Sequence, residues 1–151
     1  MLTHILRYFL SIFLGAVIGY ERELQEKSAG LRTIILVCLG STIFTTISLL
    51  LRNANGTYDL GRMIAYIVTG IGFLGGGVIF HRRDETEGVT TAATLWVVAG
   101  IGILIGLGNY VLGILSTCLV WLVLHLKYFL HLIRSNNLLF RLLQRWHQWR
   151  S

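Results

Sequence analysis

Long apolar stretches separated by short polar ones make up most of the chain. Five of them have about the 20 residues that a membrane-spanning helix needs: residues 3–20, 33–51, 63–80, 89–107 and 109–130. Only Gly108 and Asn109 separate the last two stretches, and this pair is typical of a turn. A single helix over both would be far too long for one bilayer crossing. The pattern therefore predicts an all-α polytopic membrane protein with about five transmembrane helices.

The residues after the fifth stretch follow a different pattern. Apolar side chains recur there at helical spacing, with arginine and glutamine between them: Leu138, Leu139, Leu142, Leu143, Trp146 and Trp149. Such a segment is typical of an amphipathic helix that lies in the membrane interface. We predict a transmembrane domain over residues 1–133 and an amphipathic tail over residues 134–151. The tail is interpreted as a membrane anchor, and a helix that docks on a partner is the alternative.

The positions of lysine and arginine predict which helix ends face the cytoplasm. Basic residues gather in the first loop, in the third loop and after the fifth stretch: Arg22, Lys27, Arg32, Arg82, Arg83, Lys127, Arg134, Arg141, Arg145 and Arg150. The second loop has only Arg52 and Arg62, and the fourth has none. Because cytoplasmic loops carry the excess of basic residues, we predict the N-terminus outside and the C-terminus in the cytoplasm.

Composition supports the membrane class. The chain is 54% hydrophobic and 13% charged, with a mean hydropathy of +0.68, whereas a soluble domain has about 25% charged residues. The net charge is +6, but the arginines stand at the ends of apolar stretches and form no basic stripe with aromatic residues between them. We therefore expect membrane lipid as a partner and no nucleic acid.

Glycine marks where helices are expected to pack. Each of the five glycines from Gly70 to Gly77 would cost a soluble helix roughly 1 kcal/mol relative to alanine. Membrane helices tolerate glycine and use it to bring two backbones close together. The candidate packing positions are Gly15, Gly19, Gly72, Gly75, Gly76, Gly102 and Gly106. Five short helices bury little surface alone, and the same spacing serves packing between chains, so we expect a homodimer.

A polar cluster is predicted on the cytoplasmic side. The second and fourth helices both begin there, and helix N-termini present free N–H groups and the positive end of the helix dipole. Ser28, Thr90 and Thr91 are candidates to cap these two helices. The residues expected in the cluster are Glu21, Arg22, Glu23, Arg32, Thr33, Arg82, Thr90 and Thr91.

Two interpretations of this cluster stay open. In the first, the helix starts and Arg32 form a pocket for an anion: a phosphate, a lipid headgroup or an acidic side chain of a partner. In the second, Glu21 or Glu23 neutralises Arg32, and the cluster only holds the helices together.

A charged pair is predicted on the outer side. Asp59 stands where it can cap the third helix, and Arg62 follows three residues later. The alternative is a functional ion pair that faces an outer vestibule.

The chemistry of the chain favours neither an enzyme nor a bound cofactor. No nucleophile has a paired base, and no nucleotide-binding glycine loop or metal-ligand spacing occurs. Mg²⁺ prefers carboxylate oxygens and retained water, and no Asp or Glu falls inside the five predicted stretches. The backbone carbonyls around Gly75, Gly76 and Gly77 remain as oxygen ligands, so a role in ion transport stays open.

Four ordered blocks of the sequence resemble a known family. They are GAVIGYERE at 15–23, AGLRTIILVCLGSTIF at 29–44, Asp59 and Arg62 before AYIVTGIGFLGGGVIF, and VTTAATLWVVAGIGILIGLG at 89–108. Together they resemble the MgtC/SapB family of bacterial inner-membrane proteins. Where that family usually has Gly-Leu-Thr-Thr, this chain has valine at position 89. Longer members carry a soluble C-terminal domain, so we interpret the chain as a short member.

The resemblance implies a function as well as a fold. Members of the family are associated with magnesium limitation, acid adaptation and survival inside host cells. Some act by binding other membrane proteins, ATP synthase among them. The resemblance thus implies that the chain modulates another membrane system, an ATP synthase or a transporter, by binding it during magnesium or acid stress. The alternative is a small ion channel or transporter with Mg²⁺ as the candidate ion.

Overall fold

The structure, a computed structural model, describes the backbone of residues 1–55, 59–82 and 85–136, and the side chains of residues 1–51, 59–81 and 85–126. Five helices and one short hairpin follow each other along this part of the chain. They are α1 (Leu2–Leu24), α2 (Leu31–Asn55), α3 (Leu60–Gly77), β1 (Phe80–Arg82), β2 (Glu85–Glu87), α4 (Val89–Leu107) and α5 (Tyr110–Asn136). The chain separates into two compact units, Met1–Val120 and Trp121–Ser151.

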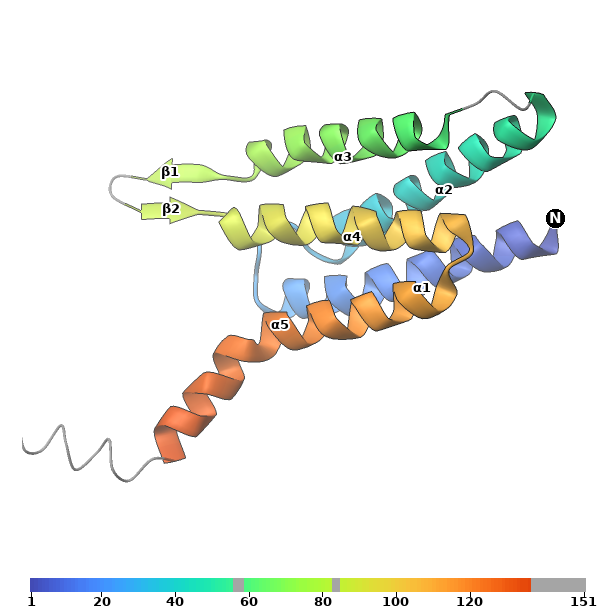
Figure 1. The fold of residues 1–151 in the computed structure, drawn as a ribbon. Coiled ribbons are helices and arrows are strands. Elements are labelled where there is room, and N and C mark those ends of the chain that lie inside the picture. Colours follow the sequence, from blue (N-terminus) through green and yellow to red (C-terminus); the bar gives the residue numbers. More distant parts are fainter. Residues whose placement is uncertain (56–58, 83–84, 137–151) are drawn as a thin grey trace, which may run out of the picture. The chain divides into compact units, whose positions relative to one another are not determined.

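The first unit is a helical bundle in which α2 packs against α1, α4 and α3 (Figure 1). The starts of α2 and α4 lie at the same end as the C-termini of α1 and α3, and the β1–β2 hairpin stands there too. We call this end of the first unit the polar end. The N-terminus of the chain lies at the opposite end.

The prediction of an all-α polytopic membrane protein is confirmed. Four of the described helices are long and apolar enough to cross a membrane: Leu2–Leu24, Leu31–Leu51, Leu60–Gly77 and Val89–Leu107. The fifth is apolar over the 17 residues Tyr110–Leu126. The tail was predicted over residues 134–151. Residues 134–136 continue α5, and residues 137–151 lie outside the described residues, so the tail and the domain boundary at 133/134 stay predictions.

The helix boundaries differ from those that hydropathy suggests, and two of the differences shape the polar end. The first helix continues to Leu24, four residues past the apolar stretch, and so carries Glu21 and Arg22 as helical residues. The third helix ends at Gly77, and the apolar residues after it lead into an antiparallel hairpin in which Phe80 pairs with Glu87. Hydropathy reports which segments prefer lipid, but it does not report where backbone hydrogen bonding changes from helix to strand.

Glycines of α1 and α4 let both helices approach α2 closely. A Cβ atom added to Gly15 would lie 3.1 Å from Ile35 Cα, and one added to Gly19 would lie 2.9 Å from Leu31 Cα. On the other side, a Cβ added to Gly102 or Gly106 would clash with α2 around Cys38 and Thr45. These four glycines are therefore positions where helix backbones approach α2 closely.

The glycines of α3 behave differently. A Cβ added to Gly75 would lie 3.5 Å from Ala92 Cβ of α4, which is ordinary van der Waals contact. A Cβ added to Gly72 or Gly76 would meet nothing within 4 Å. Phe73, which stands between them, is 85% exposed. This face of α3 therefore has no packing partner within the described part of the chain.

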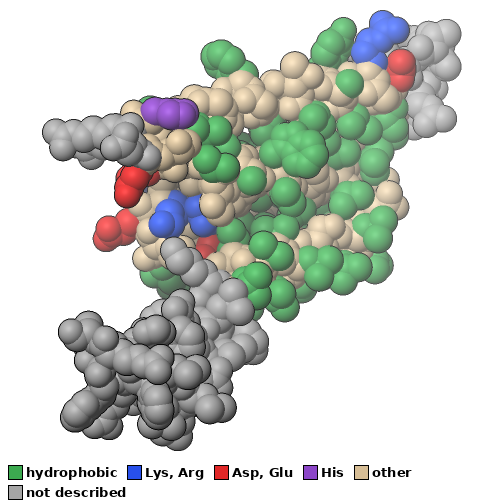
Figure 2. All heavy atoms as spheres, turned by 60° about the vertical axis from the view of Figure 1, so that its left-hand side comes forward, with side chains coloured by type: hydrophobic (Ala, Val, Ile, Leu, Met, Phe, Trp, Pro, Cys, Tyr) green, Lys and Arg blue, Asp and Glu red, His purple; other side chains and the backbone are tan. Residues whose placement is uncertain are grey.

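Three buried threonines of α2 form hydrogen bonds with helix carbonyls. Thr42 Oγ1 donates to Cys38 O within α2 and is also 2.9 Å from Gly102 O of α4. Thr45 and Thr46 donate to the carbonyls four residues before them. These bonds satisfy polar groups that would be costly to leave unpaired in a membrane interior. Figure 2 agrees, since on the face shown the charged side chains lie near the ends and hydrophobic ones between.

Candidate functional site

An arginine at the end of α1 is buried and reaches α4. Arg22 is only 3% exposed, and its Nη2 donates a hydrogen bond of 3.0 Å to Thr91 Oγ1 in the first turn of α4. Arg22 is one turn further along α1 than Gly19, so it extends the face that Gly15 and Gly19 present to the bundle. The bond joins two helices whose residues are 69 positions apart in the sequence.

A carboxylate is buried beside this arginine. Glu21 is 4% exposed and accepts a hydrogen bond through Oε1 from Gln25 Nε2, one turn later. Among the described residues, Glu21 Oε2 and Arg22 Nε have no hydrogen-bond partner. The cluster therefore keeps one acceptor and one donor for a further polar group. Glu21 lies one residue past the apolar stretch 3–20, within the helix Leu2–Leu24.

Glu23 caps the start of α2. Its Oε2 accepts a hydrogen bond of 2.8 Å from Leu31 N, the first residue of that helix. The carboxylate passes so close to Gly30 that a side chain at this position would collide with it. The cap that the sequence suggested for Ser28 thus comes from an acidic side chain of α1.

The start of α4 is fixed by backbone geometry. Gly88 precedes the helix with φ of +89°, and a Cβ there would collide with the carbonyl of Val78. No side chain caps this end of α4 within the described residues, so the capping role expected for Thr90 and Thr91 was wrong. Thr91 instead points into the bundle toward Arg22, because the hairpin and Gly88 set the direction in which the helix begins.

The other predicted members of the cluster lie at its edge. Arg32 and Thr33 are exposed in the first turn of α2, and Thr90 is exposed in the first turn of α4. Among the described residues Arg32 forms no ion pair, so neither Glu21 nor Glu23 neutralises it in this structure. The side chain of Arg82 lies outside the described residues. The structure brings together Glu21, Arg22 and Thr91, while Arg32 and Thr33 stay open to a ligand.

The opposite end of the first unit carries two arginines in different settings. Asp59 caps α3 by accepting a hydrogen bond from Arg62 N, and Arg62 Nε lies 3.9 Å from Asp59 Oδ2, both side chains being exposed. Arg7 is half-buried and donates to Gly106 O at 2.8 Å and to Tyr110 Oη at 3.2 Å. Arg7 thereby satisfies a carbonyl at the C-terminus of α4, a role that its position in the first apolar stretch does not suggest.

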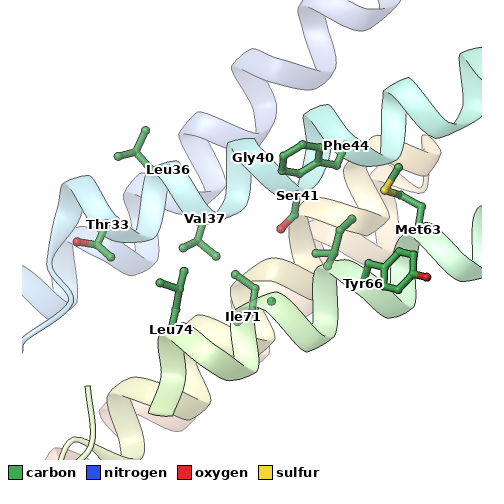
Figure 3. A pocket seen from close by; sticks show the side chains of 12 residues that line it. Thr33, Leu36, Val37, Gly40, Ser41, Phe44, Met63, Tyr66, Ile71 and Leu74 are labelled. Carbon is green, nitrogen blue, oxygen red and sulfur yellow. The ribbon is translucent and has the colours of Figure 1, made fainter. Parts of the chain in front are cut away.

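A groove opens between α2 and α3 (Figure 3). Its volume is about 670 Å³, within the range of small-molecule sites. Thr33 lies at one end, and Met63 and Tyr66 lie at the other. The remaining lining residues are Leu36, Val37, Gly40, Ser41, Phe44, Ile67, Gly70, Ile71 and Leu74. The lining is almost entirely apolar, with Thr33 marking the end near the polar end of the bundle.

The comparison with known families settles what kind of membrane protein this is. The model of the MgtC family matches residues 8–133, which include all five described helices except the ends of α1 and α5. The chain belongs to the MgtC family. The matched region contains the Glu21–Arg22–Thr91 cluster, the glycine contacts of α2 and the groove.

Curated relatives support the family assignment. "Protein MgtC" of Salmonella typhimurium (strain LT2) is 42% identical over 120 residues, which cover 80% of this chain and 50% of that protein. "Putative magnesium transporter YhiD" of Escherichia coli (strain K12) is 41% identical over 125 residues, which cover 80% of this chain and 58% of that protein. An uncharacterized protein of Haemophilus influenzae is 36% identical over 121 residues. No solved structure matches the chain.

The match to these MgtC-family relatives is partial in length. The chain spans about half the length of the curated relatives it matches. Within its described residues, no group of three His, Cys, Asp or Glu side chains is arranged to hold a metal ion. The absence of catalytic activity and the identity of any partner stay predictions.

Proposed function

We propose that this chain binds a transmembrane helix of a partner protein and thereby modulates that partner during magnesium or acid stress. The observation that carries the proposal is the difference between the glycine pairs. Gly15 and Gly19 contact α2 of the same chain, as do Gly102 and Gly106, whereas Gly72 and Gly76 meet nothing within 4 Å. Pairs of small residues four apart are the usual means of close helix association in membranes.

The partner helix would lie against α3. Only 17% of the apolar window of α3 is buried, compared with 56% for α4. The open glycines would let a foreign helix approach the α3 backbone, and the exposed ring of Phe73 would pack on it. We expect a second copy of the chain or another membrane protein as the source of this helix, and a bacterial inner membrane as the location.

The test is to fill the open glycine face. Gly72→Leu and Gly76→Leu add side chains where the chain itself has free space, so both variants should fold and insert normally. Gly100→Leu is the matched control, because a Cβ at Gly100 in α4 also meets nothing within 4 Å. The tagged chain is crosslinked in membranes, and its self-association and its copurifying proteins are quantified for each variant.

A second copy of the chain and a different membrane protein predict different changes in the crosslinking and copurification results. Loss of one copurifying membrane protein in the α3 variants supports the proposed partner, whereas loss of the crosslinked homodimer alone would make the glycine face a self-association surface. In both cases Gly100→Leu should behave as the wild type. Unchanged crosslinks in Gly72→Leu and Gly76→Leu would overturn the proposal.

A second candidate function is magnesium transport, which the printed name of YhiD favours. It predicts Mg²⁺ flux into proteoliposomes that hold only this protein, above that of empty liposomes. The positions to substitute in that assay are Gly75–Gly77, whose backbone carbonyls are the candidate oxygen ligands, and Asp59, which caps α3. Flux from the isolated chain that falls in those variants would replace partner binding as the leading account. No flux from correctly inserted protein would count against transport.

A further inference from the structure

The groove between α2 and α3 lies on a different face of α3 from the open glycines. Gly70, Ile71 and Leu74 line it, whereas Gly72 and Gly76 do not. The groove is therefore available to a ligand of its own whether or not a helix packs on the glycine face. Three of its properties identify the ligand: its length, its lining and the charge at one end.

The length of the groove corresponds to the hydrocarbon thickness of one bilayer leaflet. Thr33 and Phe44 stand at its two ends on α2, eleven residues apart. At about 1.5 Å per residue, this part of α2 is roughly 16 Å long. The hydrocarbon core of a bilayer is about 30 Å thick, so one leaflet contributes about 15 Å. An extended acyl chain of one leaflet can thus lie along the groove from end to end.

The lining of the groove suits an acyl chain. Its walls consist of aliphatic and aromatic side chains, among them Leu36, Leu74 and Phe44 (Figure 3). Ser41, in the middle of the groove, is 3% exposed, so its hydroxyl offers little to a ligand. Gly40 and Gly70 widen the groove, because a Cβ at either position would have no neighbour within 4 Å.

The charge at the groove's mouth suits a phosphate. Thr33 lines the mouth, and the exposed Arg32 stands beside it, one helical turn before the lining residue Leu36. Glu23 is held on the other side of α2 by its hydrogen bond to Leu31 N. A guanidinium and a hydroxyl at the end of an apolar groove match the phosphate of a lipid headgroup. The cation favours a headgroup with net negative charge over phosphatidylcholine, whose own choline cation balances its phosphate.

We propose that the α2–α3 groove binds one acyl chain of an anionic phospholipid, whose phosphate contacts Arg32 and Thr33 at the polar end. The proposal assigns a ligand to Arg32, which the buried cluster of Glu21, Arg22 and Thr91 does not use. It is independent of partner binding at the glycine face, because the two surfaces share no lining residue.

The test measures lipid retention by the purified full chain in native mass spectrometry. Phosphatidylglycerol and phosphatidylcholine with identical acyl chains are titrated as probes. The wild type should retain one phosphatidylglycerol per chain, with an affinity about fivefold above that for phosphatidylcholine, as expected for one basic residue near an anionic headgroup. Equal affinities for the two lipids would overturn the headgroup assignment.

Two pairs of variants separate the headgroup from the acyl chain. Arg32→Ala should lower phosphatidylglycerol retention to the phosphatidylcholine level, whereas Arg62→Ala, an exposed arginine at the opposite end, should not. Gly40→Leu fills the groove and should weaken both lipids at least fivefold, whereas Gly100→Leu should weaken neither. If Gly40→Leu lowers the melting temperature of the protein, Gly70→Leu is used in its place, because it fills the groove from α3.

A photoreactive acyl chain locates the lipid directly. Phosphatidylglycerol that carries a photoreactive group at its acyl end is incorporated into liposomes of phosphatidylglycerol and phosphatidylethanolamine with the protein. Crosslinks should concentrate on Phe44, Met63 and Tyr66 at the deep end of the groove. Crosslinks spread evenly over other lipid-exposed residues such as Phe9 and Phe13, or absent from the groove because a protein helix fills it, would overturn the proposal.

Discussion

Arg22 and Thr91 connect the end of the first helix to the start of the fourth by a buried hydrogen bond of 3.0 Å. The bond stands at the polar end of the bundle, where α2 and α4 both begin, and it leaves the arginine only 3% exposed. Because Glu21 is buried next to it, the arginine also supplies the positive charge that makes this carboxylate tolerable away from water.

Replacement of Arg22 should therefore destabilise the bundle more than replacement of any exposed arginine. Arg22→Ala leaves Glu21 buried without a neighbouring cation and removes the bond to Thr91, and we expect a loss of about 3 kcal/mol. Arg32→Ala should change the unfolding free energy by less than about 0.5 kcal/mol. Thermal unfolding of both variants in the same detergent measures the difference, and equal stabilities would contradict the interpretation.

Glu23 should act as a helix cap and not as a general surface charge. Glu23→Ala removes the acceptor for Leu31 N, and we expect a loss of about 1 kcal/mol. Glu23→Gln keeps an acceptor oxygen and should lose less. Glu26→Ala is the control, since it removes an exposed charge three residues later, just after the end of α1. A loss in Glu26→Ala as large as that in Glu23→Ala would favour a purely electrostatic role.

Two glycines of the same helix should respond oppositely to alanine. A methyl group at Gly102 would collide with the α2 backbone at Cys38, so Gly102→Ala should cost about 1–3 kcal/mol by overpacking. A methyl group at Gly100 meets nothing within 4 Å, so Gly100→Ala should keep or raise stability by up to about 1 kcal/mol. Melting temperatures of the two variants decide this, and a destabilised Gly100→Ala would show that α4 has a neighbour there.

Arg7 should stabilise the C-terminus of α4 chiefly through Gly106. Arg7→Ala loses both of its hydrogen bonds, and we expect a cost of about 2 kcal/mol, because the donor is charged. Tyr110→Phe loses only the phenol oxygen and should cost less than about 1 kcal/mol. The unfolding free energies of the two single variants and of the double variant test whether Arg7→Ala costs more stability than Tyr110→Phe. A larger loss of unfolding free energy in Tyr110→Phe than in Arg7→Ala would contradict this prediction.

Hydropathy predicted the helices, because in a bilayer these depend on local sequence. Glycine spacing indicated candidate packing positions, but it did not indicate that α1 and α4 both pack on α2. The role of Arg22 was missed, since Arg32 was preferred as the charge facing the helix starts. A signal was present: Gly15, Gly19 and Arg22 follow each other at helical spacing and so share one face. The hairpin at Phe80–Glu87 was also missed, because strands of three residues leave no periodic pattern.

The partner of Arg22 in α4 is made much later than Arg22 itself. Thr91 follows it by 69 residues, which at roughly 5–20 residues per second corresponds to about 3–14 s of synthesis. During this interval the guanidinium has no hydroxyl to bind, so the end of α1 would stay at the water interface beside the growing chain. The buried position of Arg22 is thus reached only when α4 enters the membrane, and failure of that last step would leave a charged end that quality-control proteases could recognise.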